Sequence, residues 1–88
     1  MEHILTEMKE VATEQGNMTL RYELLAETKE GMTQYGAAVT NENTGEGTRV
    51  MELTADRGRA AEFFGRISRG NVTPMTMREV AEDFVAEF

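Results

Sequence analysis

Two groups of charged side chains in this 88-residue sequence have spacings that could support chemistry. The first group is Glu79, Asp83 and Glu87, in and just after the stretch TPMTMREVAEDF, which recur every four residues and would line one face of a helix. Carboxylates one turn apart can bind a hard cation or share a proton. No converging ligands are evident elsewhere, and Glu79 can form a capping box with Thr76. We therefore interpret this face as solvated, and predict neither a metal site nor a catalytic residue in it.

The second group is Arg59, Arg66 and Arg69, which project from one side of a predicted helix with Glu62 between them. Ladders of this kind are common on exposed helices and contribute only a few tenths of a kcal/mol. Guanidinium groups are also well suited to grip a carboxylate or a phosphate. The three arginines are therefore the candidate binding residues, and they would serve a small-molecule or anion-binding protein.

The sequence offers no combination of nucleophile and base for other kinds of catalysis. The single serine, Ser68, has no base nearby in the sequence, His3 is the single histidine, and cysteine is absent. Tyr22 and Tyr35 could stack on bases, but core tyrosines are the commoner explanation. The sequence therefore predicts no enzyme and no cofactor.

Charge is distributed unevenly along the chain. The formal net charge is −7, and residues 1–48 hold nine acidic groups against three basic ones, whereas residues 49–78 hold six arginines against three acidic groups. The overall excess of negative charge repels phosphate backbones, so we expect no nucleic-acid partner. The acidic N-terminus, MEHILTEMKE, has no long apolar run, so we expect neither a secretion signal nor a membrane span. Together with the lack of cysteine, this predicts a cytoplasmic protein.

The central part, residues 18–53, is predicted to be an antiparallel meander. Residues 18–26 and 32–40 alternate between apolar and polar side chains, and TRVMEL forms a third strand. The segment TKEG supplies a turn, and Gly36 marks a bulge or a close backbone approach. The chain is long enough for one domain, residues 1–88.

Residues 1–17 are predicted to be an N-terminal helix or an extra strand. Ile4, Leu5, Met8 and Val11 recur at helical spacing, and QGN is a plausible helix stop. This periodicity favours the helix, with the strand as its rival.

Residues 54–88 are predicted to form two helices. Thr54 is the expected cap of the first helix, with Asp56 beside its positive end, and Gly70 is expected to end it. The second helix starts either at Thr73 and Pro74 or at Thr76, and runs to the C-terminus at Phe88.

The predicted fold is therefore α+β, a three- or four-stranded antiparallel meander followed by two C-terminal helices packed on one face. The residues expected to form its core are Tyr22, Leu24, Tyr35, Val39, Phe63, Phe64, Ile67, Val80 and Phe84.

Several stretches resemble a family of small bacterial domains of unknown function, found chiefly in Firmicutes. These are LRYELLAE, QYGAAV, ELTAD and NVTPMTMREVAEDFV, which together cover roughly residues 18–85. The best matches are Tyr35 with Gly36, Pro74, and the end of the last helix. The family has a histidine–leucine pair where this chain has Thr76 and Met77, so no histidine-centred site is carried over. The resemblance implies an α+β fold with an extra strand at residues 4–14, and no activity.

These observations predict a small non-enzymatic interaction or regulatory module, with the anion-binding protein as the alternative. Two helices cover only one face of a sheet, so the apolar residues at 4–12 need either that second face or a partner. We expect a homodimer built around residues 4–12.

Overall fold

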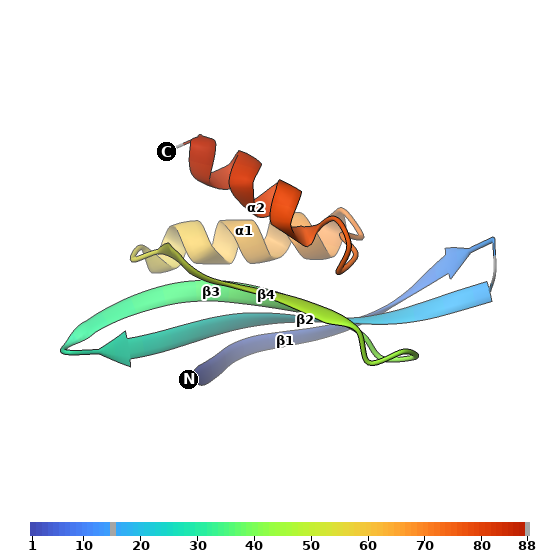
Figure 1. The fold of residues 1–88 in the computed structure, drawn as a ribbon, viewed down its shortest axis with the longest axis horizontal. Helices are drawn as coiled ribbons and strands as arrows, with labels where there is room; N and C mark the ends of the chain where they lie inside the picture. The colour runs from blue at the N-terminus through green and yellow to red at the C-terminus, as the bar shows by residue number, and fades with distance from the viewer. Residues whose placement is uncertain (15, 88) are drawn as a thin grey trace.

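Two helices cover one face of a four-stranded sheet in the computed structural model, which describes residues 1–14 and 16–87 (Figure 1). The strands follow one another across the sheet in chain order, each antiparallel to the next. They are β1 (Glu2–Thr13), β2 (Gly16–Lys29), β3 (Met32–Asn41) and β4 (Gly47–Thr54), followed by the helices α1 (Arg57–Arg69) and α2 (Met77–Ala86). The predicted α+β fold is confirmed, with four strands in the sheet.

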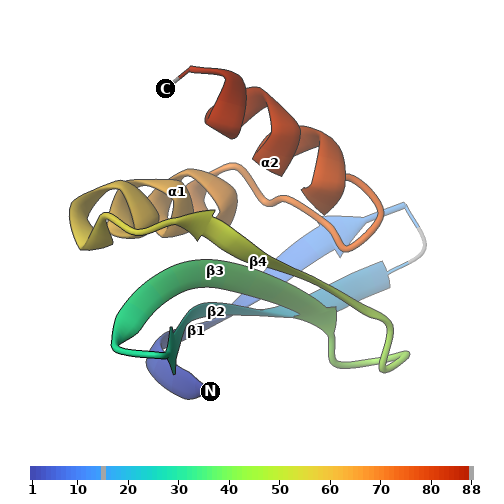
Figure 2. The same cartoon turned by 60° about the vertical axis from the view of Figure 1, so that its left-hand side comes forward.

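Both helices lie on the same side of the curved sheet, and no helix or strand of the described chain covers the other side (Figure 2). None of the described helices has the length and apolar character needed to cross a membrane.

The N-terminal segment is the extra strand that the resemblance implies, so of the two alternatives the helix favoured by its periodicity is wrong. Strand β1 pairs with β2 from Leu5 opposite Leu24 through Thr13 opposite Gly16, and its register is interrupted once, between His3 and Leu5. This bulge shifts the alternation of side chains at Ile4. Leu5 and Met8 both follow the bulge, and because they are three residues apart they fall on opposite faces of the sheet, which divides the predicted apolar stripe.

The turns between the strands follow from residues that accept left-handed backbone. The two-residue connection of β2 and β3 is Glu30 and Gly31, with φ of 54° and 80°, which is the geometry that matches strand twist. Gly45 has φ of 83° in the loop between β3 and β4. The predicted turn and hairpin loop are therefore both present.

Gly36 lies at the bulge that the sequence predicts. Tyr35 pairs with Thr54 and Ala37 pairs with Val50, so this one residue on β3 faces three residues on β4. A Cβ atom at Gly36 would meet the Met51 sulfur at 2.7 Å and would also strike the Val50 carbonyl oxygen. The close approach of β4 therefore requires glycine at this position.

The core lies between the sheet and the helices. Seven of the nine predicted core residues are buried, whereas Tyr35 and Val80 are only partly buried and pack against the core. Phe63 of α1 and Phe84 of α2 bring their ring centroids within 5.0 Å, which joins the two helices. Further buried members of the cluster are Leu20, Ala37, Leu53, Ala60, Met77 and Ala81.

Helix α1 has a defined cap at each end. The Asp56 side chain, not that of Thr54, accepts from the Arg59 N–H and is the N-cap. At the C-terminal end, the N–H of Val72 donates to the Ile67 carbonyl at 3.1 Å, and Asn71 takes the left-handed position with φ of 53°. This is a Schellman motif in which asparagine serves where glycine is more usual.

Helix α2 begins at Met77 without the predicted capping box. The Thr76 side chain makes no cap hydrogen bond and its hydroxyl instead contacts that of Thr73 at 3.2 Å. Pro74 lies in a turn before the helix rather than in its first turn. The helix ends at Ala86 with Glu87 as its C-cap, so it stops before the predicted end, and Phe88 lies outside the described residues.

The connection between the two helices is tied to the sheet by side chains from below. The hydroxyl of the fully buried Tyr22 donates to the Val72 carbonyl at 2.8 Å, and Thr48 donates to the Pro74 carbonyl at 2.7 Å. Lys9 of β1 donates to the Ser68 carbonyl at 2.9 Å, at the negative end of α1. Three strands therefore hold the last turn of α1 and the segment that follows it.

We expect Gly36→Ala to lower the free energy of unfolding by about 1–3 kcal/mol, because the added methyl group must displace β4. The matched control is Gly65→Ala in α1, where the new Cβ meets only the mobile end of the Arg69 side chain. That change should raise stability by about 0.5–1 kcal/mol through helix propensity. Chemical denaturation measures both, and equal effects of the two changes would contradict the close approach at Gly36.

We expect Tyr22→Phe to cost about 1–2 kcal/mol at neutral pH, because it leaves the Val72 carbonyl without its donor. Burial raises the pKa of Tyr22 above the usual 10.0, and the negative charge of Glu7 adds to this rise. Below pH 10 the phenol is protonated in both the folded and the unfolded chain, and above it the unfolded chain ionises first. Stability of the natural chain should therefore fall as pH rises through and above 10, more steeply than that of Tyr22→Phe. Denaturation at pH 7 and at about pH 10.5 tests this, and a constant stability difference would refute it.

Candidate functional site

The three arginines proposed from sequence lie along α1, and two of them share an acidic partner. Glu62 lies 3.9 Å from Arg59 and 4.0 Å from Arg66, which is the ladder expected from their spacing. Arg66 also donates to Glu87 at 2.8 Å, and its guanidinium lies 5.0 Å from the centre of the Phe84 ring. Arg66 therefore links the two helices, and its charge is already neutralised. This arrangement leaves the anion-binding alternative with less free positive charge than the sequence suggests.

The three acidic residues singled out from the sequence lie in α2 and at its C-cap. Glu79, Asp83 and Glu87 are exposed, and Glu87 is the partner of Arg66. Across residues 1–14 and 16–87, no three histidine or acidic side chains come close enough to hold a metal ion. The interpretation of this face as a solvated one agrees with these positions.

A polar network that the sequence did not indicate lies on the uncovered face of the sheet. The carboxylate of the buried Glu23 contacts the His3 imidazole and accepts from Arg21 at 3.1 Å, and Arg21 also pairs with Glu42. His3 lies opposite Leu25, which is buried as well. The network compensates a buried carboxylate, and it contains no nucleophile.

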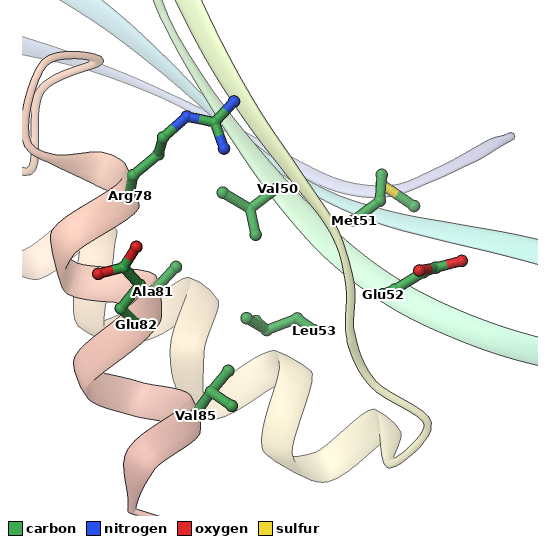
Figure 3. Close-up of a pocket in the computed structure, with 8 residues that line it drawn as sticks. All are labelled: Val50, Met51, Glu52, Leu53, Arg78, Ala81, Glu82 and Val85. Atoms are coloured by element: carbon green, nitrogen blue, oxygen red, sulfur yellow. The ribbon is translucent and has the colours of Figure 1, made fainter.

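A groove of about 290 Å³ opens between β4 and α2 (Figure 3). Its floor is formed by Leu53 from the strand and Ala81 from the helix, both of them buried. Val50 lies toward the Arg78 end of the groove and Val85 toward the other end, near Leu53, and Val85 is 44% exposed although it is aliphatic. The side chains of Met51 and Glu52 point away from the helix (Figure 3).

The bulge in β4 shapes this groove. Glu52 has φ of 56°, a left-handed conformation that costs free energy in a residue other than glycine. The turn at Glu52 places Leu53 in the core cluster and leaves Met51 over Gly36. Bulges of this kind recur beside functional sites, where they redirect side chains.

Arg78 gives one end of the groove a positive charge. Its guanidinium extends from α2 toward β4, above Val50 (Figure 3). It forms no ion pair or hydrogen bond within the described part of the chain, and Glu82 lies one helical turn further on. The groove therefore combines an apolar floor with an arginine that is available to a carboxylate.

The size and position of the groove limit what it can hold. Small-molecule pockets usually measure about 300–1,000 Å³, so this groove is at or below their lower limit. Because β4 is the last strand of the sheet, its outer N–H and C=O groups have no neighbouring strand among residues 1–14 and 16–87. An extended chain could pair with them while placing one or two side chains in the groove.

Part of this site could have been found from the sequence. Arg78, Glu82 and Val85 recur at i, i+4 and i+7, beside the predicted buried stripe of the second helix. Val85, an apolar residue in that otherwise charged row, is the signal from which the groove could have been predicted. The contribution of Leu53 could not be seen, because it depends on the bulge at Glu52.

The fold and the groove define a small two-layer α+β protein with a partly apolar groove at one edge of its sheet. The chain belongs to a family of unknown function, DUF6514, whose model matches residues 1–87. Comparisons with curated proteins and with solved structures gave no match.

We expect Arg66→Ala to lower the free energy of unfolding by about 1 kcal/mol, because it removes an ion pair and a cation–π contact that join α1 to α2. The matched control is Arg57→Ala, since Arg57 is exposed on the same helix and has no ion pair in the described chain. Thermal unfolding of the two variants gives the comparison. Equal losses would mean that Arg66 does not join the helices.

Proposed function

We propose that this protein is a small non-enzymatic interaction module that binds an extended segment of a partner protein in the groove between β4 and α2. The observation that carries the proposal is the combination of an edge strand with an apolar helix face across a groove. Added strands gain affinity from main-chain hydrogen bonds, and pockets beside the strand select side chains.

The chemistry of the lining indicates the kind of segment that fits. Leu53, Ala81 and Val85 offer an apolar surface for one bulky aliphatic side chain. Arg78 at one end favours an acidic residue next to it, because guanidinium and carboxylate form charge-assisted hydrogen bonds. We therefore infer an extended peptide in which an aliphatic residue has an acidic neighbour.

The positions of the reactive side chains support a non-enzymatic role. The Ser68 hydroxyl donates to the Gly65 carbonyl of its own helix at 3.3 Å. His3 pairs with Glu23 on the opposite side of the sheet, so serine and histidine cannot act together. A bacterial cytoplasm is the proposed location, which the absence of cysteine supports.

A library of random peptides displayed on phage, selected against the intact protein, tests the proposal. We expect the selected peptides to combine an aliphatic and an acidic residue. Their affinity, measured by fluorescence anisotropy, should fall at least tenfold with Val85→Glu, which fills the groove with charge. Arg78→Glu should also weaken binding, by an amount that depends on the acidic residue of the peptide.

Two matched variants keep the test specific. Ala86→Glu adds the same charge one residue further along, at an exposed position outside the groove, and Arg57→Glu reverses a charge on the other helix. Both should bind the peptides as the natural chain does. Failure to enrich any peptide, or affinities that are indifferent to Val85→Glu, would overturn the proposal.

A further inference from the structure

Strand β1 forms the other edge of the sheet, and this edge is long and uninterrupted from Leu5 to Thr13. Natural edges are shortened, bulged or guarded by lysine and proline. Residues 5–13 pair with β2 without interruption and contain no proline. The one lysine of this stretch, Lys9, directs its amine to the Ser68 carbonyl. Leu5 and Met8 are 47% and 54% exposed, one on each face of the sheet.

We propose that a second copy of this chain covers this edge. The β1 strands of the two subunits would pair antiparallel about a two-fold axis at Met8 and join the two sheets into one of eight strands. Such a contact is the commonest form of self-association, in which the same surface serves both partners. The proposal uses the edge opposite the groove, so it stands or falls independently of the proposed function.

The alternation of side chains limits the possible registers. Residues directly opposite each other on paired strands point to the same face of a sheet. Residues 5, 7, 9 and 11 face the helices, because they pair with β2 residues that include Leu24 and Tyr22, and residues 6, 8 and 10 face the uncovered side. A two-fold axis must therefore pass beside a residue, with that residue opposite its own copy.

Among the central residues 6–10 of this edge, charge then selects Met8 as the residue on the axis. An axis at Glu7, Lys9 or Glu10 would place that charged residue opposite its own copy, and like charges directly opposite each other are unfavourable. An axis at Thr6 would run the pairing into the bulge between His3 and Leu5.

An axis at Met8 places Glu7 opposite Lys9 of the partner subunit, twice by symmetry. It also sets Leu5 opposite Val11 of the partner subunit, and Met8 opposite its own copy. Lysine has three donors, so Lys9 can contact a carboxylate while it holds the Ser68 carbonyl. This register pairs opposite charges and covers both exposed apolar side chains.

Charge reversal tests the register directly. Glu7→Lys alone would place two lysines opposite each other, and Lys9→Glu alone would do the same with two glutamates. Each variant should be a monomer by light scattering at micromolar concentration, where the natural chain is a dimer. An equimolar mixture of the two variants should form dimers again, because every facing pair then has opposite charges. Circular dichroism checks that each variant is folded.

Because the chain has no cysteine, a single introduced cysteine can test by disulfide cross-linking which residue lies on the two-fold axis. Met8→Cys should form a disulfide-linked dimer on mild oxidation. Thr6→Cys on the same face should not, since it would lie opposite Glu10 of the partner subunit. A monomeric natural chain, a mixture of charge variants that stays monomeric, or cross-linking through Thr6→Cys in preference to Met8→Cys would each overturn the proposal.

Discussion

The hydrogen bond from Tyr22 to the Val72 carbonyl fixes how the two layers of this protein meet. A small domain with helices on one face of its sheet must turn the chain between the helices close to that face, where backbone carbonyls lose water. Tyr22 supplies the donor from the centre of the sheet at 2.8 Å, and Lys9 and Thr48 supply donors from its two edge strands. Side chains of the sheet thus hold both the end of α1 and the segment between α1 and α2.

The position of α2, and hence of the groove, depends on this anchoring. Met77 enters the core immediately after the tethered segment, and Phe84 then packs against Phe63. These contacts orient the helix so that Ala81 and Val85 face β4. Moving the tethered segment would therefore change the groove even though none of its anchoring donors lines it.

The elements that could be predicted from the sequence are those that bury a single face, because their apolar residues then recur at a regular spacing. Strand β2 alternates clearly because Leu20, Tyr22 and Leu24 all face the helices, and the stripes of α1 and α2 are equally one-sided. Strand β1 was misread because it lies at an edge, where apolar residues occur on both faces and a bulge shifts the alternation.

The candidate site was less predictable than the fold. Its helix side was present in the sequence as the row from Arg78 to Val85, but its strand side depends on Glu52 adopting a conformation that propensity disfavours. The polar network at Glu23 was equally hidden, since His3 reaches it only when residues 2–13 form a strand. The strand side of the groove and the polar network at Glu23 both depend on contacts between segments that are distant in the sequence, which local propensity does not reveal.

The two unpaired edges of this sheet differ in ways that suit different partners. The β4 edge is short and bulged, which limits pairing with a long flat strand but leaves a groove for side chains beside α2. The β1 edge is long and regular, with charges that complement their own copies about Met8. Pairing through β1 would place the two grooves at the outer edges of one continuous sheet. A dimer of this kind would bind a partner carrying two matching segments more tightly than either groove alone, because the second binding event becomes intramolecular.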